Sequence, residues 1–254
     1  MRSRIVLGLF AHPDDETFGP GASLARLASE GHEVHLFCAT RGDAGTIGTS
    51  AALGGRALAL LREAELHRAC RALGLREPEI LDLPDGGLAR LEDVTLLRPM
   101  VRVIRAVRPE VLVSFHADGI SGHLDHRTVT ARAARAFDLA AQADLWPDLG
   151  PAHAPARFWA YCIPDSKAQR LTARRLFSVP DAEVDAELDV AAHLPAKRAA
   201  VAAHASQKPF IDWLEEQLGG LDGYWAKDAF VLAAARVPLP EGARPVRDLF
   251  AGMS

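Results

Sequence analysis

Apolar residues along the chain gather in short runs that alternate with longer amphipathic stretches. The first run, Ile5–Phe10, contains only apolar residues and one glycine. A strand without polar alternation is typical of a parallel sheet whose two faces are both covered by helices. Further strands are predicted at Glu33–Cys38, Glu79–Leu81 and Val111–Phe115.

Helical spacing of apolar residues predicts the elements that connect these strands. The segment Gly42–Gly55, rich in Gly, Ser and Thr, predicts a mobile loop near the strand ends. The alternation of strands and helices predicts an α/β fold, with a Rossmann-like, mostly parallel sheet and helices on both faces. Helices are expected at Ala22–Glu30, Arg56–Leu73, Glu92–Val107 and His126–Gln142.

The pattern changes after residue 143. A breaker-rich connection at 146–155 leads into a more irregular part of the chain. We interpret residues 144–254 as an extension that walls the site formed by the alternating core, residues 1–143. One α/β domain often reaches this length, so the whole chain, 1–254, is predicted to be a single domain. In the extension, strands are predicted at Arg157–Ile163, Ala182–Val190 and Ala229–Arg236, and helices at Ala196–His204 and Asp212–Leu218.

Composition and charge limit the classes of function. Apolar residues make up 49% and charged residues 24% of the chain, which is ordinary for a soluble globular protein. The net charge of -4 offers no basic footprint for nucleic acid. No apolar stretch is long enough for a membrane anchor, and the first run is too short for a signal peptide. Cys38, Cys70 and Cys162 lie far apart and suit a reducing compartment. We expect a cytoplasmic protein. The sequence leaves the oligomeric state open, and a homo-oligomer is one of the alternatives.

Titratable residues follow directly on two of the predicted buried strands. The first strand leads into Ala11–Glu16, with the sequence Ala-His-Pro-Asp-Asp-Glu. Strand Val111–Phe115 leads into a polar loop that ends in His123–His126, with the sequence His-Leu-Asp-His. Open α/β sheets bind ligands at the carboxyl ends of their strands. Consecutive acids in such a crevice would repel one another unless a cation held them together.

The residue types at these two places predict a metal site. His123 and His126 are three positions apart and share a face of the first helical turn. One His and one Asp from the first loop, with one His from the second, would give zinc three ligands and an open position for water. The remaining His and Asp would then serve acid–base chemistry. A dinucleotide-binding oxidoreductase would instead need G-x-G-x-x-G at the first turn, where this chain has acids.

Each motif alone also has a purely structural interpretation. The acids of Ala11–Glu16 could face a helix dipole, and the two histidines could be solvated helix residues. The placement of both motifs after separate buried strands favours the metal site over coincidence.

Together the two motifs resemble those of the LmbE-like family of zinc N-deacetylases. This family includes the GlcNAc-phosphatidylinositol deacetylases and the sugar deacetylases of mycothiol and bacillithiol synthesis. Leu124 stands where the family usually has proline, but this position is not a ligand, so we expect the chemistry to be retained. Weaker resemblances lie at Thr40–Gly45, Leu61–Leu66 with Leu73 and Gly74, Leu83–Gly86 and His204–Gln207.

The resemblance implies which residues bind the metal. His12, Asp15 and His126 would hold one Zn²⁺ per chain. These ligands also suit another divalent metal such as Fe²⁺, so the native metal stays open.

The resemblance also implies roles for five further residues. Asp14 would be the general base on the metal-bound water. His123 would be the acid and oxyanion partner, oriented by Asp125, whose negative charge would raise the pKa of the imidazole. Arg62 and Asp85 match positions that contact the sugar in related deacetylases.

The resemblance therefore implies a metal-dependent hydrolase that removes the N-acetyl group from an N-acetylglucosamine-type sugar or glycoconjugate. Its partner would be a small N-acetylated sugar, attacked at the amide by a zinc-activated water. An amidase acting on a thiol-sugar conjugate is an alternative that would share every catalytic residue. A non-catalytic metal- or sugar-binding protein on the same fold is another. The presence of Asp14 and His123, which the metal itself does not need, favours an enzyme.

A few other residues are weaker candidates for contact with the sugar. Single aromatic residues stack on sugars but are more often part of the core. For His204, the alternative to contact with the sugar is a role in packing the C-terminal helix. These candidates are His116, Trp159, Tyr161, His204, Trp213 and Trp225.

Overall fold

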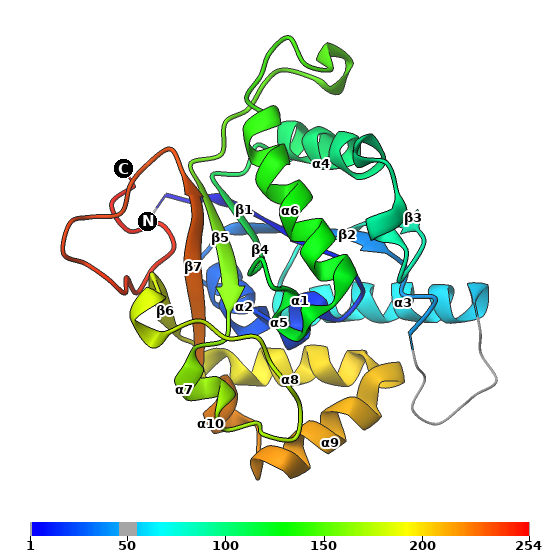
Figure 1. The fold of residues 1–254 in the computed structure, drawn as a ribbon, viewed down its shortest axis with the longest axis vertical. Coiled ribbons are helices and arrows are strands. Elements are labelled where there is room, and N and C mark those ends of the chain that lie inside the picture. The colour runs from blue at the N-terminus through cyan, green and yellow to red at the C-terminus, as the bar shows by residue number, and fades with distance from the viewer. Residues whose placement is uncertain (1, 46–54, 254) are drawn as a thin grey trace.

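The computed structural model of the chain describes residues 2–45 and 55–253. Within these ranges the strands form one seven-stranded sheet of order β3-β2-β1-β4-β5-β7-β6 (Figure 1). Most of the predicted loop Gly42–Gly55 lies outside the described residues. The strands are β1 Ile5–Phe10, β2 Glu33–Thr40, β3 Glu79–Leu83, β4 Val111–Phe115, β5 Arg157–Cys162, β6 Ala186–Asp189 and β7 Lys227–Ala235.

The sheet is mostly parallel, as the sequence predicts. Strands β1 to β5 pair in parallel, whereas β7 is antiparallel to β5 and β6 is antiparallel to β7. The strand predicted at Ala182–Val190 is shorter in the structure. The N–H of Glu183 donates to the carbonyl of Pro180 and closes a 3-10 turn, so the extended pairing begins only at Ala186.

Helices connect the strands as expected, with short additional helices at the loops. The helix predicted from His126 begins two residues earlier, at Leu124, because the His123 side chain accepts the N–H of Asp125 and caps the first turn. The helices are α1 Asp15–Phe18, α2 Gly21–Ser29, α3 Arg56–Leu73, α4 Asp93–Val107, α5 Gly119–Gly122, α6 Leu124–Leu139, α7 Asp165–Ala168, α8 Leu194–Ala203, α9 Lys208–Leu218 and α10 Asp222–Trp225.

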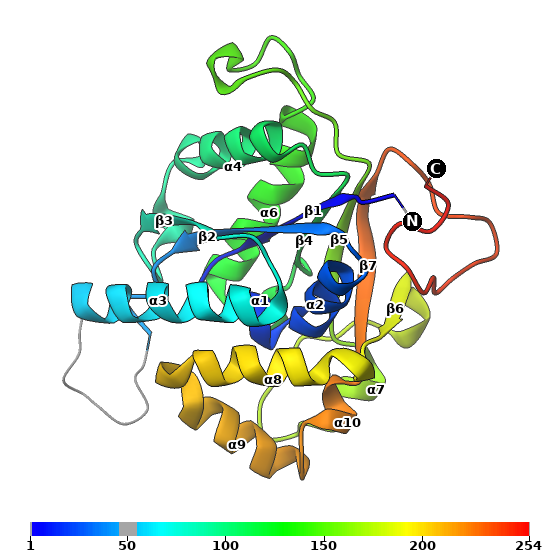
Figure 2. The same ribbon diagram turned by 180° about the vertical axis from the view of Figure 1, so that it is seen from behind.

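The buried strand β1 supplies side chains to both faces of the sheet. Val6 and Phe10 pack in one core layer with residues of α2, α3 and α8. Leu7 and Leu9 pack in the opposite layer with residues of α4 and α6. Figure 2 shows these two groups of helices on opposite sides of the sheet, with α9 beyond α8. Burial on both faces explains why β1 contains no polar residue.

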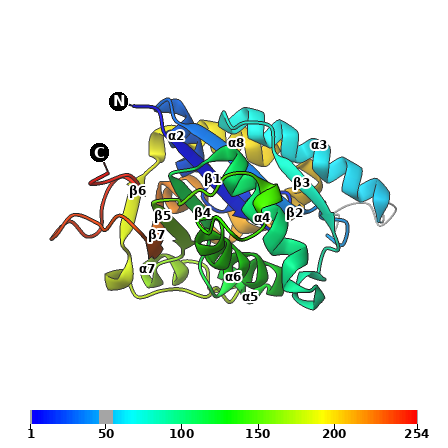
Figure 3. The same ribbon diagram turned by 90° about the horizontal axis from the view of Figure 1, so that it is seen from above.

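The order of the strands places the two sequence motifs side by side. β1 pairs with β2 on one side and with β4 on the other, and both neighbours are visible from above in Figure 3. The chain therefore moves first toward one edge of the sheet and later returns to the other side of β1. Such a reversal creates a crevice between the loops at the carboxyl ends of the two central strands.

The residues after 143 continue the same sheet and join the core through buried polar contacts. Ser206 donates its N–H and its hydroxyl to Glu65 of α3, at 2.8 and 2.6 Å. The fully buried Lys197 of α8 donates to the carbonyl of Gly19 at 2.7 Å. These contacts support our proposal that the chain forms one domain. None of the helices in the described ranges has the length and apolar character needed to cross a membrane.

Arg157 fixes the end of the chain against the sheet. Its buried guanidinium on β5 donates to the backbone carbonyls of Val237, Pro238, Leu249 and Ala251. The segment 237–251 lies outside regular helices and strands. It therefore depends on this one side chain for several of its hydrogen bonds.

We expect the substitution Arg157→Met to lower the free energy of unfolding by about 3 kcal/mol or more, since several carbonyls would lose a charged donor. Denaturant-induced unfolding measures this change. Arg71→Met is the matched control, because the Arg71 side chain is 59% exposed and its ion pair with Glu77 is worth little. Equal effects of the two substitutions would contradict the role given to Arg157.

Candidate functional site

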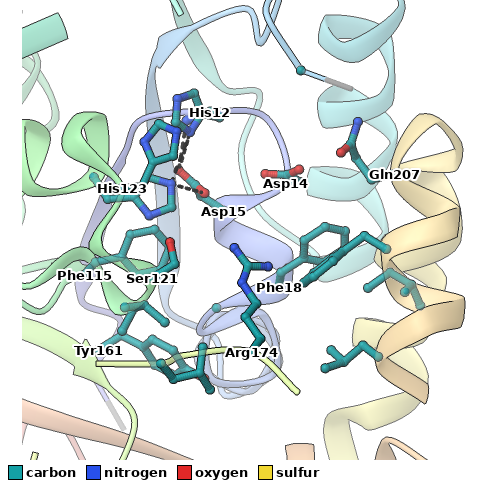
Figure 4. Close-up of a pocket in the computed structure, with 18 of the residues that line it drawn as sticks. His12, Asp14, Asp15, Phe18, Phe115, Ser121, His123, Tyr161, Arg174 and Gln207 are labelled. Carbon is teal, nitrogen blue, oxygen red and sulfur yellow. Dashed lines mark hydrogen bonds and ion pairs between the residues drawn. The ribbon is translucent and has the colours of Figure 1, made fainter. Parts of the chain in front are cut away.

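A cavity of about 430 Å³ lies at the carboxyl ends of β1 and β4. The side chains of His12, Asp14 and Asp15 reach it from the loop after β1 and from α1. Those of His123 and His126 reach it from the start of α6. Figure 4 shows that His12, His123 and Asp15 lie close together, whereas Asp14 is set apart. The structure thus brings both motifs into one site.

His12, Asp15 and His126 converge on one point. His12 Nδ1 lies 3.2 Å from His126 Nε2, and His126 Nε2 lies 3.1 Å from Asp15 Oδ1. The third distance, from His12 Nδ1 to Asp15 Oδ2, is 3.6 Å. Asp15 Oδ2 also accepts the backbone N–H groups of Ala11 and His12, which fix the carboxylate. The two imidazole nitrogens and the two carboxylate oxygens of Asp15 therefore gather at one place. His12 and His126 also form, together with His123, a group that could hold a metal ion.

The hydrogen bonds around these two imidazoles fit a bound cation. His126 Nδ1 donates to the carbonyl of Gly119 at 3.1 Å, which leaves its Nε2 lone pair directed at the centre. His12 Nε2 faces carboxylates, which leaves its Nδ1 lone pair directed at the same centre. Two lone pairs 3.2 Å apart, beside a carboxylate, repel unless a proton or a metal ion lies between them. The donor set, two imidazoles and one carboxylate, suits zinc.

The carboxylates around the two imidazoles favour positive charge at this place. Burial lowers the pKa of His12, but Asp125, Asp15 and Asp85 outweigh it and raise the pKa well above its usual range. Burial likewise lowers the pKa of His126, and Asp15 outweighs it, so the net shift is upward. The pKa of Asp15 is well below its usual range, because the attraction of the two histidines outweighs burial.

The carboxylate of Asp125 contacts His12 and not the ring of His123. Its Oδ2 lies 3.3 Å from His12 Nε2, and its carboxylate accepts the N–H groups of Gly86 and Leu88 at 2.7 and 3.1 Å. We expected this carboxylate to orient His123 and to raise its pKa. Its negative charge does act to raise the pKa of His123, but the carboxylate contacts His12, and only the backbone N–H of Asp125 reaches His123 Nδ1, at 3.2 Å.

His123 borders the metal-binding point as a neutral imidazole. Its ring nitrogen lies within 4.8 Å of ligand nitrogens of His12 and His126. Burial, followed by the positive charges of those two histidines, lowers its pKa, although Asp125 acts in the opposite direction. Since Nδ1 accepts a backbone N–H, the proton of the neutral ring resides on Nε2.

Asp14 points away from the metal-binding point and toward Arg62. Its backbone has a φ of 114°, a left-handed conformation that is strained for a residue with a Cβ. Arg62 Nη2 lies 2.8 Å from Asp14 Oδ2, and the same guanidinium donates to the carbonyls of Pro13 and Gly42. Burial raises the pKa of Asp14 to about 6, and Asp15 adds to the rise, while Arg62 opposes it. Asp14 therefore holds its proton more readily than an ordinary carboxyl.

Asp85 reaches the cavity from the turn after β3. Its Oδ1 lies 3.0 Å from His12 Nε2, and its Oδ2 accepts the N–H of Ala44 at 3.0 Å. Burial raises the pKa of Asp85, but His12 outweighs it and the pKa falls below its usual range. Arg62 and Asp85 both line the cavity, and each is also bound to a residue of the first motif. Their contact with the sugar stays a prediction.

Glu16, the last acid of the first motif, points away from the cavity. Its Oε1 accepts His204 Nε2 at 2.8 Å, and its Oε2 accepts the backbone N–H of Asp14 at 3.0 Å. Both side chains of the Glu16–His204 pair are fully buried. Burial lowers the pKa of His204, but Glu16 outweighs it and the pKa rises. His204 therefore links the extension to α1, and it is not among the described residues that line the cavity.

The remaining candidates from the sequence divide into cavity and core. Tyr161 and Trp225 line the cavity, whereas Trp159 is fully buried and donates its indole N–H to the carbonyl of Leu249. Neither His116, which pairs with Asp118, nor Trp213 is among the described residues that line it.

Sequence reasoning missed much of the cavity wall. Arg174 and Gln207 line the cavity, as do apolar residues such as Leu171, Phe210 and Leu214. Phe210 and Leu214 lie on α9, and Leu171 and Arg174 lie in the segment after α7; none of these four carries a motif, whereas Gln207 ends the weak resemblance at His204–Gln207. Only their meeting in the fold identifies them.

Comparison with known proteins agrees with the motifs. Residues 7–137 match the family described as PIG-L: GlcNAc-PI de-N-acetylase. The chain is 36% identical over 248 residues to the 1D-myo-inositol 2-acetamido-2-deoxy-alpha-D-glucopyranoside deacetylase of Thermobispora bispora, covering 82% of this chain and 80% of that protein. It is 33% identical over 297 residues to the protein of the same name from Streptomyces griseus, covering 99% of this chain and 89% of that protein.

Solved structures share the fold at lower identity. The N,N'-diacetylchitobiose deacetylase of Pyrococcus horikoshii superimposes with a TM-score of 0.69 at 20% identity, over 91% of this chain and 84% of that one. The 4-carboxy-2-hydroxymuconate hydratase GalB of Pseudomonas putida superimposes with a TM-score of 0.70 at 21% identity, over 94% of this chain and 99% of that one. At these identities the likeness establishes the fold alone. The match to the family over more than half of the chain, together with the identity to the deacetylases, shows that this chain belongs to the PIG-L, or LmbE-like, family.

Proposed function

We propose that the protein is a metal-dependent N-deacetylase that hydrolyses the acetamido group of an N-acetylglucosamine-type sugar or glycoconjugate. The observation that carries the proposal is the gathering of His12, Asp15 and His126 at one place, with the carboxylate of Asp14 in the same cavity but bound to Arg62. The names of the related inositol-glucosaminide deacetylases support the same reaction. The hydratase shares only the fold, so it does not favour a second activity.

His12, Asp15 and His126 would hold the metal, for which we propose zinc. A bound zinc would polarise the amide carbonyl and lower the pKa of a water molecule from 15.7 to roughly 7. Asp125 and Asp85 position His12 through its Nε2, and the carbonyl of Gly119 positions His126 through its Nδ1. Partners of this kind fix the orientation of a ligating imidazole and raise its basicity.

Asp14 is the proposed general base. Its carboxylate belongs to the same loop as the ligands but is turned toward Arg62, which keeps it out of the ligand set. A pKa of about 6 leaves it ionised at neutral pH, yet makes it a better proton acceptor than an ordinary aspartate. Arg62 acts as a positioning residue, because it holds Asp14 and the neighbouring backbone together.

His123 is the proposed partner of the oxyanion that develops on the amide carbonyl. A neutral ring with its proton on Nε2 donates one hydrogen bond and adds no charge that would repel the metal. The leaving amine then takes its proton from Asp14, which received one from the water. In this scheme the Asp125 carboxylate orients His12, not His123.

Two alternatives to the deacetylase can be tested at the same site. A thiol-sugar amidase would use the same ligands and base, and a binding protein would retain the metal without turnover. We also propose that the protein acts in the cytoplasm, because Cys38, Cys70 and Cys162 are all free and buried.

The substitution Asp14→Asn tests the base. We expect kcat for release of acetate from N-acetylglucosamine glycosides to fall at least about 100-fold, since general-base catalysis contributes 10² to 10⁴. The bound zinc content should stay at that of the unmodified protein. His126→Ala is the contrasting variant and should lose both zinc and turnover. Near-normal turnover of Asp14→Asn would refute the assignment.

The pH profile tests the environment of Asp14. The base must be ionised, so kcat/KM should fall tenfold per pH unit on the acid side, with an apparent pKa of about 6 or below when a metal cation is bound. Arg62 holds this pKa down, so Arg62→Met should move the acid limb to higher pH. An acid limb that does not move in Arg62→Met would contradict the coupling.

A further inference from the structure

The cavity has two chemically different halves. One half carries the metal-binding residues and Asp14, Arg62 and Asp85. The other half is built from side chains of the extension and of α1, among them Phe18, Tyr161, Leu171, Phe210, Leu214 and Trp225. Within the described residues, this second half contains no side chain that is charged at neutral pH, apart from Arg174 at its border.

Arg174 belongs functionally to the polar half. Figure 4 shows its guanidinium directed toward Asp14 and Asp15. The guanidinium carbon also lies 5.2 Å from the centre of the Phe210 ring, so the aliphatic part of the side chain covers apolar surface. The apolar half therefore keeps its character up to the point where the reacting amide would lie.

Several residues of the apolar half belong to the buried core. Tyr161 and Trp225 are 3% and 2% exposed and pack in the same core layer as β1 and β4. Leu171 and Leu214 belong to the same layer. A cavity of about 430 Å³ also falls within the range of pockets that enclose small organic ligands.

We infer that the substrate carries an apolar group, of the size of an aryl ring or a medium alkyl chain, next to the sugar and its amide. This inference rests on the proposed function and specifies its substrate class. In the apolar half, a polyhydroxylated ring such as inositol would meet mostly apolar surface. Gln207, the hydroxyls of Tyr161 and Tyr224 and the guanidinium of Arg174 would replace only part of its hydrogen bonds to water, which is unfavourable. An apolar group would instead gain about fourfold in affinity for each methylene that it buries.

The apolar group can be attached at either of two places on the same substrate. It can be the aglycone on the anomeric oxygen, or an acyl chain longer than acetyl on the amide nitrogen. The reaction is the same in both cases. The carbon–nitrogen bond breaks, water supplies the hydroxyl of the released carboxylic acid, and the amine takes up a proton.

A substrate series with the zinc-loaded full-length protein tests the inference. One arm compares methyl, myo-inositol, hexyl and phenyl glycosides of N-acetylglucosamine. The other arm compares methyl glucosaminides that carry N-acetyl, N-butyryl and N-hexanoyl groups. We expect kcat/KM to rise at least tenfold with apolar size in one arm, and the arm that rises identifies the position of the group. An inositol glycoside that is cleaved as well as or better than every apolar member overturns this inference but leaves the proposed function intact. If no member of the series is hydrolysed while zinc is bound, both this inference and the proposed function are overturned.

Two leucines of α9 provide a matched pair of variants. Leu214 lines the cavity, whereas Leu218, one turn further along the same helix, packs against the core and is not among the lining residues. Leu214→Asn should lower the ratio of kcat/KM between the preferred apolar substrate and the methyl N-acetylglucosaminide at least fivefold. Leu218→Asn should leave this ratio unchanged within twofold. Phe210→Ser, at a half-buried position, replaces Leu214→Asn if the latter fails to fold. An unchanged ratio in the cavity variant overturns the inference.

Discussion

The strained turn at Asp14 is the feature on which the site depends. The φ of 114° occurs at Asp14 in the loop after β1, and α1 begins at the next residue. Such a conformation costs of order 1–3 kcal/mol and persists only where the surroundings hold it. Glu16 holds it by accepting the Asp14 N–H, and Arg62 holds it by binding both the carboxylate and the carbonyl of Pro13. Because of this turn, three consecutive acids point in three directions. Asp15 meets the two histidines, Asp14 meets Arg62, and Glu16 meets the extension.

The contact of Glu16 with His204 makes the extension part of the catalytic geometry. Both residues are fully buried, and removing one member of such a pair typically costs 3–5 kcal/mol. The pair connects α1 to the end of α8, and the pairing of Glu65 with Ser206 connects α3 to the residues that follow α8. The wall of the cavity and the turn that carries the base are therefore held by one set of buried polar contacts.

Local sequence patterns predict part of this arrangement, and tertiary contacts determine the rest. Burial on both faces leaves a continuous apolar run, so β1 and β4 could be predicted, and the loops at their ends identified His12 and His126. The partner of Asp125 could not be predicted, because it is set by two backbone N–H groups of a turn 37 and 39 residues earlier in the chain. Leu214 and Trp225 look like ordinary core residues, and only the tertiary structure places them beside the metal-binding residues.

The residues proposed to carry out the reaction and the residues that border the substrate's apolar group lie in different parts of the chain. The proposed metal ligands, the proposed base Asp14 and His123 all lie within residues 7–137, the part of the chain that matches the family. The apolar wall comes mostly from residues 161–225, outside that match. A substitution in the wall can therefore change which group fits beside the amide without touching a ligand or the base. Since a hydratase also shares this fold, the fold by itself constrains the chemistry little. The proposed ligands and base favour amide hydrolysis, whereas the apolar wall favours a group beside the amide that is less polar than inositol.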